Sequence, residues 1–173
     1  FSSAASPDGF SSETFLPKFL PKTFFFLQNT HKTSLMSFNL PKTDKKRVVI
    51  VGGGFGGLKL ANKLKNSQFQ VVLIDRNNYH QFPPLIYQIA SAGIEPSSIS
   101  FPFRKIFQRR KNFFYRMAEV RSIFPEHKII QTSIGKVRYD YLVLAAGATT
   151  NFFGNANVEE EAMPMKNVSE AMG

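Results

Sequence analysis

The chain has 173 residues, of which 43% are hydrophobic, and its 22 Lys and Arg residues against 12 Asp and Glu give a net charge of +10. This size suits one ordinary domain with its own core, and the charge favours anionic partners such as phosphates, acidic lipid surfaces or nucleic acid. The absence of cysteine excludes a disulfide framework, a cysteine-based zinc cluster and a redox dithiol.

The first segment, residues 1–46, is rich in Ser, Phe, Lys and Pro and shows no sustained helical or strand period. Its prolines interrupt any helix. It lacks the Arg of a mitochondrial transit peptide and the order of elements of a signal peptide, and no apolar run approaches the roughly 18 residues of a membrane span. We therefore expect residues 1–46 to be an extension, disordered or foreign to the domain. The sequence from Met36 onward looks like the natural start of a protein, so residues 1–35 are expected to lie outside the working domain.

The pattern changes at Arg47, which opens the predicted domain, residues 47–173. Residues 47–51 (RVVIV) form a β-branched run stopped by glycine, as expected of a buried parallel strand. Residues 55–65 carry apolar side chains at helical spacing, and residues 70–75 (QVVLID) predict a second buried strand. Strand, glycine turn, helix and strand in this order predict a βαβ unit.

The remainder predicts shorter elements. A serine (Ser97, Ser98 or Ser100) is expected to cap a helix through Phe103 to Gln108. Within residues 113–139, short segments of alternating apolar and polar residues are separated by turns, which predicts an antiparallel meander. Residues 141–147 predict another buried strand, and a polar loop is expected to lead to a helix that begins at Val168. The fold class is therefore α/β, with a Rossmann-like parallel sheet and an antiparallel meander.

The strongest motif is the glycine-rich segment Gly52-Gly53-Gly54-Phe55-Gly56-Gly57. It has the spacing G-x-G-x-x-G, in which the first glycine permits a tight turn, the second lets a pyrophosphate approach the backbone and the third lets helix and strand pack closely. The helix that begins here offers unpaired N–H groups to phosphates. Asp75 follows eighteen residues after Gly57 at a strand end, where its carboxylate can bind ribose hydroxyls. The segment predicts a dinucleotide site.

The fingerprint alone leaves FAD and NAD open, although the acid at Asp75 disfavours NADP. This sequence follows its βαβ unit with a meander and then a strand that ends in Ala146-Gly147. That order resembles the FAD domain of the glutathione-reductase-like flavoproteins, in which the matching small residues lie close to the cofactor. The alternative for Ala146 and Gly147 is ordinary packing at the end of a buried strand.

Within that superfamily, the missing cysteines exclude a thiol–disulfide enzyme and disfavour a sulfide:quinone reductase. The stretch RNNYHQFPPLIYQIASAG (residues 76–93), followed by EPSSI (residues 95–99), resembles the type II NADH dehydrogenases, which are NADH:quinone oxidoreductases. The resemblance covers the chain from about Lys45 onward.

The resemblance implies roles for individual residues. The glycine segment would touch the FAD pyrophosphate, Asp75 would hold the adenosine ribose with Arg76 beside it, and Val120 would meet the adenine through its backbone. Pro84 would lie near the flavin. The predicted cofactor-binding residues are Gly52, Gly53, Gly54, Phe55, Gly56, Gly57, Asp75, Arg76, Pro84, Val120, Ala146 and Gly147. No catalytic residue and no metal ligand is predicted.

The resemblance also implies a reaction, in which hydride passes from NADH to FAD and two electrons then pass to a quinone without proton pumping. This chemistry belongs to the flavin. The parent protein would be peripheral on the cytoplasmic face of the inner membrane, with a homodimer as a further expectation. The chain contains one dinucleotide fingerprint where a complete member needs two. We therefore expect a fragment that binds FAD weakly or not at all and does not oxidise NADH.

Two other functions stay open, namely another flavoprotein of the superfamily such as a ferredoxin-reductase-like protein, and a non-catalytic nucleotide-binding module that holds nucleic acid. No nucleic-acid motif supports the second, and nucleic acid is not an expected partner. A basic cluster near residues 104–111 faces either acidic lipid headgroups or only solvent. His80 is expected to be a hydrogen-bonded loop residue rather than a catalytic one.

Overall fold

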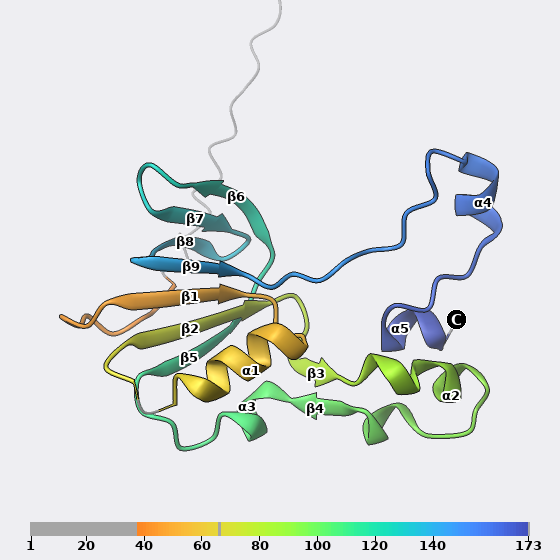
Figure 1. The fold of residues 1–173 in the computed structure, drawn as a ribbon, viewed down its shortest axis with the longest axis horizontal. Coiled ribbons are helices and arrows are strands. Elements are labelled where there is room, and N and C mark those ends of the chain that lie inside the picture. Colours follow the sequence, from red (N-terminus) through yellow and green to blue (C-terminus); the bar gives the residue numbers. More distant parts are fainter. Residues whose placement is uncertain (1–37, 66, 173) are drawn as a thin grey trace, which may run out of the picture. The chain divides into compact units, whose positions relative to one another are not determined.

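A computed structural model of the chain describes residues 38–65 and 67–172. The expectations for residues 1–37 lie outside this part. The central element is a four-stranded parallel sheet in the order β5-β2-β1-β9 (Figure 1). Its strands are β1 (Arg47–Val51), β2 (Gln70–Asp75), β5 (Phe113–Met117) and β9 (Tyr141–Leu144). Helix α1 (Phe55–Lys63) connects β1 to β2, so the predicted βαβ unit is confirmed.

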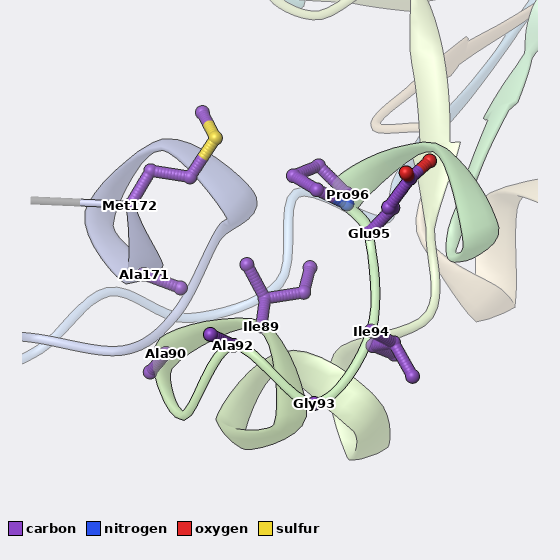
Figure 2. A pocket seen from close by; sticks show the side chains of 9 residues that line it. All are labelled: Ile89, Ala90, Ala92, Gly93, Ile94, Glu95, Pro96, Ala171 and Met172. Carbon is purple, nitrogen blue, oxygen red and sulfur yellow. The ribbon is translucent and has the colours of Figure 1, made fainter.

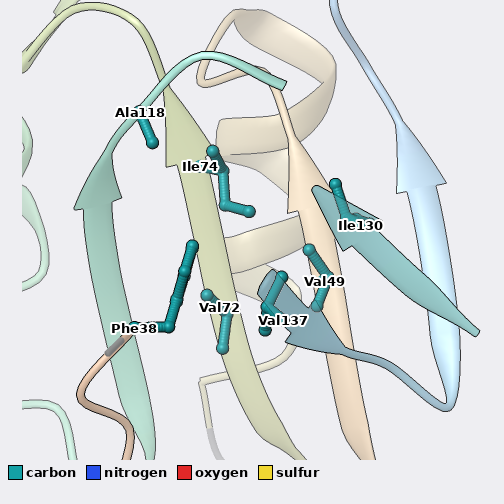
Figure 3. Packing of buried hydrophobic residues seen from close by; sticks show 7 residues of the cluster. All are labelled: Phe38, Val49, Val72, Ile74, Ala118, Ile130 and Val137. Atoms are coloured by element: carbon teal, nitrogen blue, oxygen red, sulfur yellow. The ribbon is translucent and has the colours of Figure 1, made fainter. Parts of the chain in front are cut away.

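Strands β1 and β2 are buried because their side chains alternate between two cores. On one face, Val49, Val72 and Ile74 pack with Phe38, Ala118, Ile130 and Val137 (Figure 3). On the other face, Val48, Ile50 and Leu73 pack under α1 and under Phe103 and Phe107. A strand that is covered on both sides has no polar face, which is why both strands could be recognised as continuous apolar runs.

The first of these cores is covered by an antiparallel sheet of β6 (Val120–Phe124), β7 (Ile129–Thr132) and β8 (Gly135–Arg138). The meander is therefore confirmed for these strands, but the prediction that it begins at Phe113 is wrong. Strand β5 pairs in parallel with β2 instead. Its side chains serve both cores, with Phe113 and Tyr115 on the α1 side and Phe114 on the other.

The stretch between β2 and β5 folds into short elements. Strands β3 (Tyr79–Gln81) and β4 (Ser100–Pro102) pair antiparallel, and between them lie η1 (Pro83–Leu85), α2 (Ile86–Ala90) and η2 (Pro96–Ser98). Helix α3 (Phe103–Ile106) follows β4 directly. The expected serine cap is wrong, because the serines belong to η2 and β4 and the helix begins after Pro102 without a side-chain cap.

After β9 come α4 (Ala156–Glu161) and α5 (Val168–Ala171). Helix α4 falls where a loop was expected. The Asn155 side chain accepts a hydrogen bond from the Val158 amide and so caps it. Helix α5 lies where a helix was predicted, and its Val168 packs against Ile86 and Ile89 of α2.

Packing extends upstream of Arg47, across the boundary that composition suggested. Phe38 is buried in the core, and its carbonyl oxygen accepts a hydrogen bond from Arg116 at 3.1 Å. The Pro41 carbonyl accepts one from the Gln70 side chain, also at 3.1 Å. Residues 38–46 therefore belong to the folded unit. Of the helices in the described residues, none combines the length and apolar character needed to cross a bilayer.

Candidate dinucleotide-binding site

The candidate site lies where the carboxyl ends of the parallel strands meet, the edge at which ligands bind in such sheets. The glycine segment follows β1, Asp75 ends β2, and Ala146 and Gly147 follow β9 (Figure 1). Backbone hydrogen bonds continue past the strand ends. The Gly52 amide donates to the Ile74 carbonyl at 2.8 Å, and the Ala145 amide donates to the Val51 carbonyl at 2.7 Å. The site residues from three strands are thus held at one edge.

Two glycines are required by close packing. Gly52 has φ +100°, and a Cβ there would collide with the Ala145 carbonyl oxygen. A Cβ at Gly57 would collide with the Gly52 carbonyl oxygen, because helix α1 leaves the strand at very short range. Gly54 differs, since a Cβ there would meet no protein atom within 4 Å. The bend is therefore tight inside and open at Gly54, where a ligand can approach the backbone.

The start of α1 presents unpaired donors. The first four N–H groups of a helix have no intrahelical partner, and the Leu58 amide is the first that reaches back, to the Gly54 carbonyl at 2.9 Å. No side chain caps α1 and no acid lies in its first turn. Gly54 and Gly56 are exposed. This terminus therefore offers hydrogen bonds and a positive dipole end to an anion.

Asp75 points at the bend. Its Oδ2 accepts a hydrogen bond from the Gly53 amide at 2.5 Å and its Oδ1 accepts one from the Asn77 amide at 2.8 Å. The carboxylate is half-buried, and each oxygen keeps further acceptor capacity. The predicted proximity of acid and glycine bend is confirmed, while Arg76 beside it is exposed.

Gly53 is also held from the opposite side. Its carbonyl oxygen lies 2.9 Å from Nδ1 of the buried His80 in β3, and a Cβ on Gly53 would collide with the Phe103 ring. The His80 ring meets the Phe55 ring edge-on, with the centroids 5.5 Å apart. His80 is therefore hydrogen-bonded, as expected. It lies in a strand, however, and not in a loop, and its partner belongs to the glycine bend.

Sequence reasoning did not find Tyr115 of β5. Its hydroxyl donates to the Asn77 carbonyl at 2.6 Å. Burial, and then the nearby Asp75 carboxylate, raise the pKa of this phenol above its usual value. The hydroxyl therefore stays protonated and steadies the turn after β2. No local pattern could reveal this, because Tyr115 lies 38 residues from its partner.

The remaining candidates differ in position. Ala146 and Gly147 are exposed beside the bend, with Gly147 at φ +76°. Val120 opens β6 and is partly buried, and the chain just before it is tied to β2 by the Ala118 amide, which donates to the Asp75 carbonyl at 2.9 Å. Pro84 is exposed in η1. Its neighbour Phe82 is the link to the bend, since the Phe82 ring meets the Phe55 ring with the centroids 5.5 Å apart.

These observations fit a dinucleotide. The uncapped helix terminus suits a diphosphate, the space at Gly54 leaves the backbone open to it, and the Asp75 carboxylate lies beside the same bend with the acceptor capacity that ribose hydroxyls require.

A separate pocket of about 550 Å³ lies between α5 and the turn after α2 (Figure 2). It is open and mostly aliphatic, and Glu95 is the charged residue among those that line it. A wall with an acid and no base does not suit a phosphate, so the glycine bend remains the candidate site. Within the described residues, no three His, Asp or Glu side chains gather in a way that could hold a metal ion.

Comparisons with known proteins match most of the chain to one family. Residues 46–171 match the family model for pyridine nucleotide-disulphide oxidoreductases. The chain is 36% identical over 132 residues to the type II NADH:quinone oxidoreductase Ndh of Mycobacterium tuberculosis, which covers 74% of this chain and 28% of that protein.

Two solved structures are similar as well. The structure of NDH2 from Plasmodium falciparum in complex with NADH gives a TM-score of 0.68 at 31% identity, over 74% of this chain and 27% of that one. The sulfide:quinone oxidoreductase from Aquifex aeolicus gives 0.65 at 30% identity, over 73% of this chain and 30% of that one. The chain therefore spans less than a third of the length of each of these relatives.

Proposed function

Since the chain belongs to the pyridine nucleotide-disulphide oxidoreductase family, we propose that it is the FAD-binding part of an enzyme that oxidises NADH and reduces a quinone. The observation that carries this proposal is the arrangement of Asp75 and the glycine bend. The carboxylate oxygen lies 2.5 Å from the Gly53 nitrogen, beside an uncapped helix terminus. The similarity to proteins named NADH:quinone oxidoreductases supports the choice of substrates.

The proposal assigns binding and orientation to this chain. The amides at the start of α1 hold the diphosphate, Asp75 accepts hydrogen bonds from the ribose, and the backbone of Val120 meets the adenine. Ala146 and Gly147 leave room beside the bend because they lack bulk. A bound flavin supplies the redox chemistry by accepting hydride from NADH and delivering electrons to a quinone. Since that chemistry resides in the flavin, no side chain of this chain is assigned a catalytic role.

Nuclear magnetic resonance of the 173-residue chain tests the FAD site directly, because it detects weak binding. Addition of FAD is expected to move the amide signals of residues 52–57 and Asp75. The dissociation constant is expected to be larger than that of a complete enzyme. Mixed with NADH and menadione, the chain is expected to show no turnover. If FAD moved only amide signals outside residues 52–57 and Asp75, the proposed FAD site would be wrong. NADH turnover by this chain alone would contradict its role as a binding part.

The matched variants are Gly54→Val and Lys136→Ala. A side chain at Gly54 points into open space, so it leaves the fold intact while blocking the approach of a diphosphate. Lys136 is exposed in β8, away from the bend, and its replacement should change nothing. Loss of the FAD-induced shifts in the first variant and their retention in the second support the proposed site.

A second proposal concerns an acidic membrane surface. Helices α1 and α3 cover the same core, and neither contains an Asp or Glu. Their outer sides and the turn after α3 carry exposed cations: Lys59, Lys63, Arg104, Lys105, Arg109 and Lys111. Such a face is attracted to anionic lipid headgroups, each cation contributing about 1 kcal/mol near the surface. This supports a peripheral position on the cytoplasmic face of a membrane.

Sedimentation with lipid vesicles tests this second proposal. The chain is expected to pellet with vesicles that contain phosphatidylglycerol, to stay in solution with pure phosphatidylcholine, and to be released by salt. The quadruple variant K59Q/K63Q/R104Q/K105Q should lose binding. The control K128Q/K136Q, with one lysine in the turn before β7 and the other in β8, should keep it. Equal binding by both variants would show that this face is not the contact. Analytical ultracentrifugation of the same samples reports whether two copies associate as a homodimer.

A further inference from the structure

His80 lies beneath the glycine bend and its tautomer is fixed by its partner. The side chain is 7% exposed, and Nδ1 lies 2.9 Å from the Gly53 carbonyl oxygen. A carbonyl oxygen only accepts hydrogen bonds, so Nδ1 must carry the proton that is donated. Neutral His80 is therefore the Nδ1–H tautomer, with Nε2 unprotonated.

The peptide between Gly53 and Gly54 transmits this bond to the open side of the bend. In a trans peptide the carbonyl and the following N–H point in opposite directions, and the described residues contain no cis peptide bond. Since His80 holds the Gly53 carbonyl inward, the Gly54 amide is directed outward. Across residues 38–65 and 67–172, no protein group accepts a hydrogen bond from that amide. A donor is thus aimed at the exposed surface of the bend.

His80 is itself held in place by its neighbours. His80 is paired with Phe101 across β3 and β4, and the Phe103 amide donates to the Asn78 carbonyl at 3.0 Å just before β3. The Phe55 ring also contacts the imidazole, edge-on. Asp75 holds the N–H of Gly53 while His80 holds its carbonyl. One residue of the bend is therefore fixed by side chains from two different sheets.

We infer that His80 is a positioning residue that, through Nδ1, turns the Gly53–Gly54 peptide so that the Gly54 amide faces a bound diphosphate. This inference rests on the proposed dinucleotide site and assigns a determinant of it that lies 27 residues away from the bend. The bond survives protonation of the ring, because Nδ1 donates in both states.

Three variants separate this role from simple packing. Asparagine places its amide nitrogen near the position of Nδ1, glutamine places it near Nε2, and leucine has no donor. Urea unfolding checks that His80→Asn, His80→Gln and His80→Leu are folded. Binding of ADP, which carries the diphosphate without the flavin, is then followed by the amide signals of residues 52–57. The asparagine variant should bind like the unsubstituted chain, and the other two about three- to tenfold more weakly.

Two readouts need no ligand. In mildly alkaline buffer, the ¹⁵N signals of His80 should show a protonated Nδ1 and an unprotonated Nε2. Residual dipolar couplings should give the Gly54 N–H the same orientation in the chain and in His80→Asn, and a changed one in His80→Leu. An Nε2–H tautomer, or a Gly54 orientation unaffected by leucine, overturns the inference. If the unsubstituted chain does not bind ADP, the proposed site fails, and these two readouts still decide the role of His80.

Discussion

Asp75 Oδ2 lies 2.5 Å from the Gly53 nitrogen, so the carboxylate at the tip of β2 holds the bend that follows β1. The acid therefore has two tasks. It accepts a backbone N–H within the protein, and in the proposed function it accepts ribose hydroxyls with its remaining lone pairs. Loss of the carboxylate affects the shape of the bend as well as the contact with a ligand, and substitutions can separate the two effects.

Asp75→Asn should bind FAD more weakly than the unsubstituted chain while keeping part of its stability, because its one amide oxygen can still accept from Gly53 but its NH₂ group cannot accept from Asn77. Asp75→Ala removes the acceptor, so the free energy of unfolding should fall by about 1.5–3 kcal/mol, the range for a hydrogen bond to a charged group. Urea unfolding measures the stability, and FAD-induced amide shifts measure the binding. Equal stability of the two variants would mean that the Gly53 bond does not hold the bend.

Gly57→Ala should destabilise the protein by about 1–3 kcal/mol, as expected of overpacking. The new Cβ collides with the Gly52 carbonyl oxygen, which is backbone and cannot swing aside. The control is Gly56→Ala, one position earlier, where a Cβ meets nothing within 4 Å and alanine favours the helix by up to about 1 kcal/mol. Thermal unfolding of both should give shifts of opposite sign, and a neutral Gly57→Ala would contradict the close approach of helix and strand.

Arg110→Lys should cost about 1–2 kcal/mol of stability, because lysine cannot keep both the hydrogen bond and the stacking. The guanidinium donates to the Ala61 carbonyl at 3.1 Å and lies 4.7 Å from the centre of the Phe107 ring. Partial burial lowers the pKa of Arg110 from its ordinary value. Exposed Arg109→Lys is the control and should change the urea midpoint little. Similar effects in the two variants would show that Arg110 does not tie the turn after α3 to α1.

The raised pKa of Tyr115 predicts that the protein loses stability at alkaline pH. Burial and Asp75 raise its pKa in the folded protein above the ordinary 10.0, so the folded state keeps the proton while the unfolded chain releases it. The contribution of the protonated Tyr115 to the free energy of unfolding is complete below pH 10.0 and declines as the pH rises beyond that value. Tyr115→Phe lacks this contribution, and its urea midpoint should fall less between neutral and strongly alkaline pH. The exposed Tyr141→Phe should behave like the unsubstituted chain.

The elements that could be predicted from the sequence are those whose cause is local. Strands β1 and β2 begin and end where expected because each is a short apolar run bounded by polar residues or glycine. The glycine bend and Asp75 could be placed together because parallel strands end at one edge.

What could not be predicted depends on distant contacts. Strand β5 resembles one strand of a meander until its pairing with β2 is known. The turn after α3 and the role of Arg110 depend on the Ala61 carbonyl, which is 49 residues away. The contribution of His80 depends on Gly53 in the same way. None of these residues carries a pattern in its own neighbourhood, so no sequence period could indicate its partner.

The position of β1 between β2 and β9 has a consequence for synthesis on the ribosome. One neighbour begins at Gln70 and the other only at Tyr141. While the intervening residues are being translated, one side of a valine- and isoleucine-rich strand has unpaired amides and carbonyls, a template on which another nascent chain can align. The interval of greatest exposure to misassembly therefore ends when Tyr141–Leu144 emerges and pairs with β1.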